Sequence, residues 1–152
     1  MVSTDQIKQL REETAVSIIE CKNALEKANG DFKKAKEILK KRGKEMSGKK
    51  SSRETSSGII DSYIHPNKEI GVLLELSCET DFVAKSEDFQ TLAHELCLQI
   101  AAMGKEVPLL QQPWVKDQSK SIKELIEEYI IKLGENITVK KFVRYGLKIA
   151  DE

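Results

Sequence analysis

Three consecutive stretches at the start of the chain repeat low-polarity residues every three or four positions, the spacing of one helix face. The three sets are Ile7, Leu10 and Thr14; Ile18, Cys21, Leu25 and Ala28; and Phe32, Ala35, Ile38 and Leu39. Ser3, Ser17 and Asp31 precede the sets as N-caps, while Gly30 and Gly43 are placed to end the second and third helices. The pattern predicts a three-helix bundle over residues 1–43, small enough to need support from the rest of the chain.

Residues 44–57 are rich in lysine, serine and glycine, and Met46 is their one large apolar residue. This composition predicts a flexible basic linker. The basic run around it also suggests a nucleic-acid contact: Lys40, Lys41, Arg42, Lys44, Lys49 and Lys50. No aromatic residue is interleaved for base stacking, so the pattern favours a solvated helix end followed by a flexible segment.

The period changes after the linker. Residues 59–64 and 70–77 alternate like strands, and His65-Pro66-Asn67-Lys68 between them is typical of a turn. Helical spacing returns over residues 86–103 and 121–133, on either side of a proline-containing stretch, 106–120, that we expect to be irregular. A final strand is expected to carry its apolar residues on one face: Ile137, Val139, Val143, Tyr145 and Leu147. Residues 58–152 therefore predict an α+β core with a three-stranded antiparallel sheet and a helix pair packed on one face.

Composition narrows the class of protein. The 152 residues carry 25 basic and 25 acidic groups, but residues 1–55 hold 14 basic and 9 acidic groups, so the two predicted units differ in surface charge. No apolar run approaches the length of a membrane span, and no secretory signal is visible at the N-terminus. Cys21, Cys78 and Cys97 are odd in number and far apart, so each is interpreted as a small buried apolar residue. We therefore expect a cytoplasmic protein.

Catalytic motifs are scarce. The two histidines, His65 and His94, fall in different elements, and Leu98 stands where a metalloprotease motif beginning at His94 would need its second histidine. His94 and Cys97 lack further ligands with metal-binding spacing, and neither glycine-rich phosphate-binding motif occurs. An enzyme with covalent chemistry is not expected, and neither is a bound metal or cofactor.

Thr80, Asp81, Phe82 and Val83 lie between a predicted strand and a predicted helix, where surface groups are well placed to bind a partner. From residue types alone, a structural interpretation is favoured, in which Thr80 caps a short turn and Phe82 packs in the core. Two bundle residues, Arg11 and Ile19, stand at the edge of the apolar helix faces. The stem of Arg11 can pack there while its charged head stays free, and a single exposed isoleucine such as Ile19 needs no functional explanation.

Several motifs together resemble the elongation factor Ts family, over nearly the whole chain and in the order and spacing of that family. In the first half they are Arg11-x-x-Thr14, Cys21-Lys22-Asn23-Ala24-Leu25, Ala28-Asn29-Gly30-Asp31 and Tyr63-Ile64-His65-Pro66. In the second half they are Cys78-Glu79-Thr80-Asp81-Phe82-Val83-Ala84, Gly134-Glu135-Asn136-Ile137 and Phe142-Val143-Arg144-Tyr145.

The resemblance implies a guanine-nucleotide exchange factor for elongation factor Tu, with an N-terminal bundle like a ubiquitin-associated domain. It implies that Arg11, Ile18 and Ile19 touch the nucleotide-binding domain of the partner. It also implies that Thr80–Val83 reach toward the partner's Mg²⁺ and phosphate site, with Asp81 and Phe82 as the intruding pair. Phe82 is then expected to be exposed, against the interpretation from residue types alone.

Long members of the family continue into a second core half, whereas this sequence ends at Glu152. It resembles the short form, in which a second copy supplies the missing half, and a homodimer is therefore our hypothesis. Two alternatives to an exchange factor stay open from the sequence. One is a binding adaptor that uses the bundle alone, and the other is an RNA-binding translation accessory that uses residues 40–53, although we expect no specific nucleic-acid binding.

Overall fold

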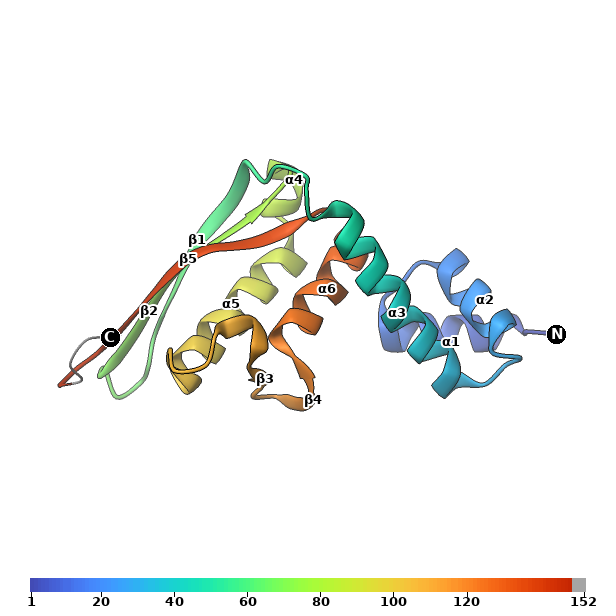
Figure 1. Cartoon of the computed structure of the whole chain (residues 1–152), viewed down its shortest axis with the longest axis horizontal. Coiled ribbons are helices and arrows are strands. Elements are labelled where there is room, and N and C mark those ends of the chain that lie inside the picture. The colour runs from blue at the N-terminus through green and yellow to red at the C-terminus, as the bar shows by residue number, and fades with distance from the viewer. Residues whose placement is uncertain (149–152) are drawn as a thin grey trace.

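The computed structural model describes residues 1–148 and shows a small helical bundle joined by one long helix to a sheet covered by two helices (Figure 1). The last four residues of the predicted core unit, 149–152, lie outside the described part. The main helices are α1 (Thr4–Thr14), α2 (Ile18–Lys27), α3 (Phe32–Lys50), α4 (Asp81–Ala84), α5 (Glu87–Met103) and α6 (Ile122–Leu133). The strands are β1 (Ser57–Ile64), β2 (Ile70–Cys78), β3 (Pro113–Trp114), β4 (Asp117–Ser121) and β5 (Ile137–Gly146). Among the helices of residues 1–148, none combines the length and apolar character that a bilayer crossing requires.

The N-terminal bundle has the predicted helix starts. Ser3 caps α1 with a complete capping box, and the side chains of Ser17 and Asp31 cap α2 and α3. Gly30 has a positive φ of +83°, which a glycine adopts without steric cost and which turns the chain into α3. The bundle core contains Leu10, Val16, Cys21, Ala24, Leu25, Ala28, Ala35 and Leu39.

The third helix does not end at Gly43, so this prediction was wrong. It continues to Lys50, and residues 44–50 are helical rather than part of a flexible linker. Gly43 is a buried interior position where an added Cβ would collide with Cδ1 of Ile131 on α6. The glycine therefore permits a close approach between α3 and α6, and this tertiary contact outweighs its poor helix propensity.

The sheet has the strand order β1-β2-β5, and both pairs are antiparallel. Helices α5 and α6 lie on the same side of it (Figure 1), as the α+β prediction required. Phe89, Leu92, Leu96 and Ile100 of α5 are fully buried, and they lie in one apolar core with Leu74 and Leu76 of β2 and with Ile122 of α6. Burial of this single face drives the packing of the unit.

The final strand does not carry its apolar residues on one face, because a bulge interrupts it. Leu76 pairs with Val139 and Glu75 with Lys141, so Lys140 has no partner on β2. The extra residue reverses the alternation, which places Ile137 toward the core but leaves Val143 and Tyr145 exposed.

The stretch 106–120 has more structure than predicted. A single 3₁₀ turn at Leu109–Gln111 leads into the short hairpin of β3 and β4. Two fully buried amides hold it: Gln99 Nε2 donates to Gln112 Oε1 at 3.0 Å, and Gln112 Nε2 donates to the carbonyl oxygen of Val107 at 2.8 Å. These contacts satisfy polar groups that would otherwise be costly to bury.

The other face of the sheet is largely apolar and uncovered within the described chain. Its exposed large apolar residues are Ile60, Ile64, Leu73, Val143 and Tyr145, and we call this set the open sheet face; the exposed Ser62 and Lys141 lie among them. Leu73 lies at its centre, paired with Ser62 on one side and with Val143 on the other.

Candidate functional site

The segment Thr80–Val83 forms a sharp corner between β2 and α5. Strand β2 ends at Cys78, Thr80 is the N-cap of the one-turn helix α4, and Ser86 caps α5 directly afterwards. The hydroxyl oxygen of Thr80 accepts a hydrogen bond from the backbone N–H of Val83 at 3.3 Å. We call residues 80–83 the binding corner; the capping role predicted for Thr80 is confirmed.

Exposure divides the binding corner into an inner and an outer side. Val83 and Ala84 are buried in the main core, whereas Asp81 is exposed and the side chain of Phe82 is 86% exposed. The interpretation of Phe82 as a core residue is therefore wrong. The ring of Phe82 is thus available to a partner, whereas the side chain of Val83 is not.

A carboxylate from the far end of the chain holds the backbone of the corner. Glu135 follows Gly134, the left-handed residue that ends α6, and its Oε1 accepts hydrogen bonds from the N–H groups of Glu79 and Thr80 at 3.1 and 3.0 Å. Its Oε2 accepts a third hydrogen bond from the hydroxyl of Thr80 at 2.6 Å. In return, Oε2 of Glu79 accepts from the N–H of Asn136 at 2.7 Å.

The three thiols are buried and free, and the structure gives none of them a reactive environment. Burial, together with the nearby carboxylates of Glu135, Asp81 and Glu79, raises the pKa of Cys78 to about 11. Burial raises the pKa of Cys97 to about 12. Because the thiolate is the nucleophile, neither group is suited to covalent chemistry near neutral pH.

The predicted bundle residues lie apart from the binding corner. Arg11 is exposed in the last turn of α1, and Ile18 and Ile19 are 53% and 71% exposed in the first turn of α2. The three residues flank the short α1–α2 connection, in the bundle, whereas α4 lies on the core near the other end of α3 (Figure 1). The predicted site residues therefore lie in two separate exposed regions of the structure.

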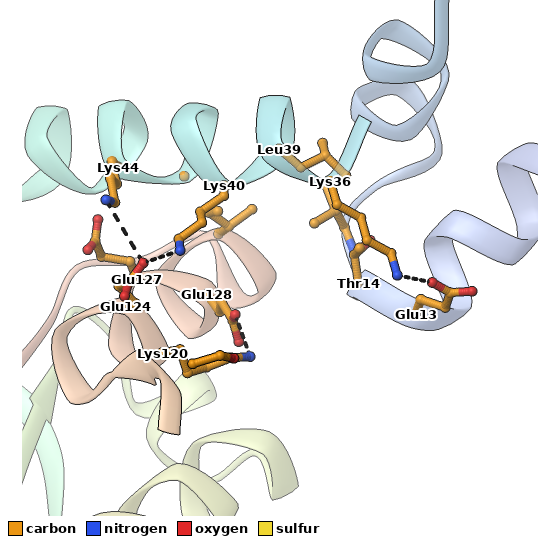
Figure 2. A pocket seen from close by; sticks show the side chains of 14 residues that line it. Glu13, Thr14, Lys36, Leu39, Lys40, Lys44, Lys120, Glu124, Glu127 and Glu128 are labelled. Carbon is orange, nitrogen blue, oxygen red and sulfur yellow. Dashed lines mark hydrogen bonds and ion pairs between the residues drawn. The ribbon is translucent and has the colours of Figure 1, made fainter. Parts of the chain in front are cut away.

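A hollow of about 300 Å³ lies between the bundle and the core, and none of the predicted site residues lines it. Figure 2 shows Lys36, Lys40 and Lys44 of α3 facing acidic residues of α1 and α6 across it. Lys40 pairs with Glu124 at 2.6 Å, and Lys36 pairs with Glu13. Since most of these charges already neutralise one another, the hollow is part of the interface between the two units.

Two residues beside the corner had no role in the sequence predictions: Glu79 and Glu135. They are 56 positions apart, and each accepts hydrogen bonds from the backbone of the segment that carries the other. Local patterns cannot find such a pair. The only signal was that both residues belong to motifs shared with the family that the chain resembles.

Fold and site together define a small α+β protein with an exposed turn on its core and a helical bundle beside it. The profile of the protein family described as Elongation factor TS matches residues 3–103 and 79–149. The chain belongs to the elongation factor Ts family.

Its curated relatives carry the same name. The chain is 40% identical to elongation factor Ts of Coprothermobacter proteolyticus over 193 aligned positions, which cover 96% of this chain and 98% of the relative. It is also 40% identical to the protein of Thermotoga maritima over 191 positions, which cover 96% of both chains. An alignment of 193 positions exceeds the 152 residues of this chain, so at least 41 positions of the first relative have no counterpart here.

Proposed function

We propose that this protein is a translation elongation factor that binds elongation factor Tu carrying GDP, promotes release of the GDP and so allows GTP to enter. Membership of the elongation factor Ts family supports the partner and the reaction. The observation that carries the proposal is the 86% exposed ring of Phe82 on a turn anchored by buried residues. No covalent step is required, so the protein acts as an exchange factor rather than as an enzyme.

In this proposal the binding corner works by differential binding. Burial of the Phe82 ring in a pocket of the partner stabilises the complex by roughly 1.5–3 kcal/mol. If that pocket opens only when the Mg²⁺ and phosphate site is distorted, nucleotide affinity falls by a comparable amount. The reciprocal effect lets incoming GTP weaken the binding of the exchange factor, which then dissociates.

The negative charge of Asp81 is proposed to weaken nucleotide binding in the same direction. It is exposed next to Phe82 in the first turn of α4. A carboxylate brought toward bound Mg²⁺ and phosphate competes for the cation and repels the phosphate oxygens, and both effects loosen the nucleotide. Thr80 and Val83 shape the turn that carries the pair.

The bundle is proposed to dock on the nucleotide-binding domain of the partner. Ile18 and Ile19 supply exposed apolar area at the start of α2, and Arg11 in the last turn of α1 is an exposed donor for a carboxylate or carbonyl oxygen. This second contact would provide affinity that does not depend on the binding corner.

We further propose that two copies associate through the open sheet face. Five large apolar side chains are exposed on one face of the sheet, and a contiguous apolar patch is typical of an interaction surface. Two such faces related by a two-fold axis can pack as a sandwich, which is the common way in which apolar sheet faces are covered. Because translation factors work where ribosomes are, the proposed location is the cytoplasm, and no specific nucleic-acid contact is proposed.

Release of fluorescent GDP from elongation factor Tu tests the exchange function. The chain should accelerate release, and Phe82→Ala should reduce the maximal acceleration by about tenfold or more, as expected for loss of an anchor worth at least 1.4 kcal/mol. Leu110→Ala is the matched control, since Leu110 is an exposed apolar residue outside both contact regions. Equal rates for the parent and Phe82→Ala would refute the proposed mechanism.

A further inference from the structure

The binding corner cannot hold its own orientation. Helix α4 comprises only residues Asp81–Ala84, a single turn, and an isolated turn of this length is unstable in water. Val83 and Ala84 fix its inner side in the core, but the outer side that carries Asp81 and Phe82 makes no such contact. The direction in which Phe82 points therefore depends on the backbone that leads into the turn.

That backbone is held by the carboxylate of Glu135. The three hydrogen bonds from Glu79 and Thr80 are 2.6 to 3.1 Å long, and they use both oxygens of the side chain. Bonds to an ionised acceptor are shorter and stronger than neutral ones, and a carboxylate that accepts three of them is fixed in position. Glu135 is itself placed by the left-handed Gly134 and by the start of β5, so its position is set by the core.

The hydrogen bonds form a relay from Glu135 into the turn. Because the hydroxyl of Thr80 donates its proton to Glu135, its lone pairs are free to accept from the N–H of Val83. The same carboxylate therefore sets the rotamer that makes Thr80 an effective helix cap.

A second set of contacts ties the corner to Arg53, three residues after the end of α3. Glu79 accepts from the N–H of Asn136 and lies 3.7 Å from the guanidinium of Arg53, and Asn136 Nδ2 donates to the carbonyl oxygen of Arg53 at 2.9 Å. Among residues 1–148, by contrast, the Asp81 side chain has no hydrogen-bond or ion-pair partner. Glu79 and Glu135 are thus engaged within the protein, while Asp81 is left available to a partner.

We infer that Glu135 is a positioning residue for nucleotide exchange, which holds the Thr80–Val83 turn so that Asp81 and Phe82 face the partner. The inference rests on the proposed exchange function. It predicts that loss of the Glu135 carboxylate lowers the maximal exchange rate by about tenfold, because small misplacements of a reacting group have large rate effects. The factor concentration at half-maximal rate should change much less, since the bundle contacts remain.

A double-mutant cycle with Phe82 tests this role. Glu135→Ala, Phe82→Ala and the double variant are compared in the fluorescent GDP assay with elongation factor Tu. If Glu135 acts through the orientation of Asp81 and Phe82, the combined loss is much smaller than the product of the two single losses, because Phe82→Ala already removes part of what Glu135 positions. Losses that multiply would overturn the inference, since they would show that Glu135 acts independently of the ring.

Further variants separate positioning from folding. Glu135→Gln keeps an acceptor for the two N–H groups and an amide that can bond the Thr80 hydroxyl, so it should retain most of the exchange rate. A loss as large as that of Glu135→Ala would contradict a geometric role. If Glu135→Ala is unfolded by circular dichroism at the assay temperature, Glu135→Asp, whose carboxylate is too short to reach all three donors, replaces it in the cycle. Glu128→Ala is the matched control, because Glu128 lies on α6 and pairs with Lys120 of β4, outside the contacts of the corner.

The outcomes distinguish this inference from the function on which it rests. If Phe82→Ala alone is as active as the parent, the proposed exchange mechanism and the inference both fail. If Phe82→Ala is slow while Glu135→Ala is as active as the parent, only the positioning role fails.

Discussion

Two glutamates on one helix experience opposite environments at the interface between the bundle and the core. Glu127 is 7% exposed, and burial raises the pKa of its carboxyl group above the usual value. The hydrogen bond from Lys40 instead lowers the pKa of Glu124. Both face α3 across the hollow in Figure 2, so the interface contains one carboxylate that opposes folding when ionised and one that favours it.

Glu127→Gln should therefore stabilise the protein at neutral pH. A carboxyl group whose pKa is raised by folding adds to the free energy of unfolding at pH values below its unfolded-state pKa. This stabilisation is lost as the pH rises through the folded-state pKa. Removing the charge should raise the midpoint of thermal unfolding by about 2 °C at pH 7, and the gain should shrink toward pH 4.

Glu124→Gln, on the same helix, should change the stability in the opposite direction. Folding lowers the pKa of Glu124, so the ionised carboxylate adds to the free energy of unfolding above its unfolded-state pKa, and this stabilisation is lost as the pH falls. Glu124→Gln should therefore be less stable than the parent at pH 7. Calorimetry at both pH values checks the pair. A lower midpoint for Glu127→Gln at pH 7 would contradict the role assigned to burial.

At the scale of single residues, the sequence predicted the features that depend on residues nearby in the sequence. Thr80 was predicted as a cap from its residue type, and the exposure of Phe82 followed from the family resemblance. The contacts of Glu135 with Thr80 could not be predicted, because they join positions 55 residues apart and depend on where α6 ends.

At the scale of elements, α3 shows how tertiary packing decides a helix boundary. Its interior contains Gly43 and Gly48, and both lower the intrinsic stability of a helix. Nothing lies within 4 Å of a Cβ built on Gly48, whereas a Cβ on Gly43 would collide with Ile131. The two glycines thus have the same local effect and different surroundings.

Gly43→Ala should destabilise the protein, whereas Gly48→Ala should stabilise it by up to about 1 kcal/mol through helix propensity. The collision at Gly43 should cost about 1–3 kcal/mol, which outweighs the same gain in propensity. Urea unfolding measures both variants.

Ile131→Val removes the colliding Cδ1 atom and serves as the background for a second comparison. In that background, Gly43→Ala should gain the stability that the higher helix propensity of alanine provides. An equal effect of Gly43→Ala with and without Ile131→Val would show that the close approach does not govern this position.

The difference between local sequence effects and tertiary contacts explains which element boundaries the sequence predicted. Helix starts at Ser3, Asp31 and Ser121 were correct because capping is local. The end of α3 and the bulge at Lys140 were missed, because the first depends on α6 and the second on pairing with β2.

At the scale of the whole molecule, one face of the sheet is covered and the other is open. Helices α5 and α6 bury the inner face, while Leu73, Val143 and Tyr145 remain exposed on the outer face. A proposed second copy would cover this surface and double the number of binding corners in the assembly.

Leu73→Lys should convert the proposed dimer to a monomer, because it buries a charge at the centre of the paired sheets. Sedimentation velocity at micromolar concentration measures the change, with Leu110→Lys as an exposed control outside the sheet. A parent chain that sediments only as a monomer and retains full exchange activity would refute the dimer.

Helix α3 runs without a break for 19 residues and therefore spans about 28 Å. A partner that touches both the α1–α2 connection and the Thr80–Val83 turn meets them at a separation that is already set, so the second contact requires no ordering of a chain. Each residue added between Leu39, in the bundle core, and Gly43, which approaches Ile131 of α6, would rotate one region by about 100° relative to the other. The length of this helix is thus a rotational constraint, and insertions there would preserve the relative direction of the two regions only near whole numbers of turns, at about 7, 11 or 18 residues.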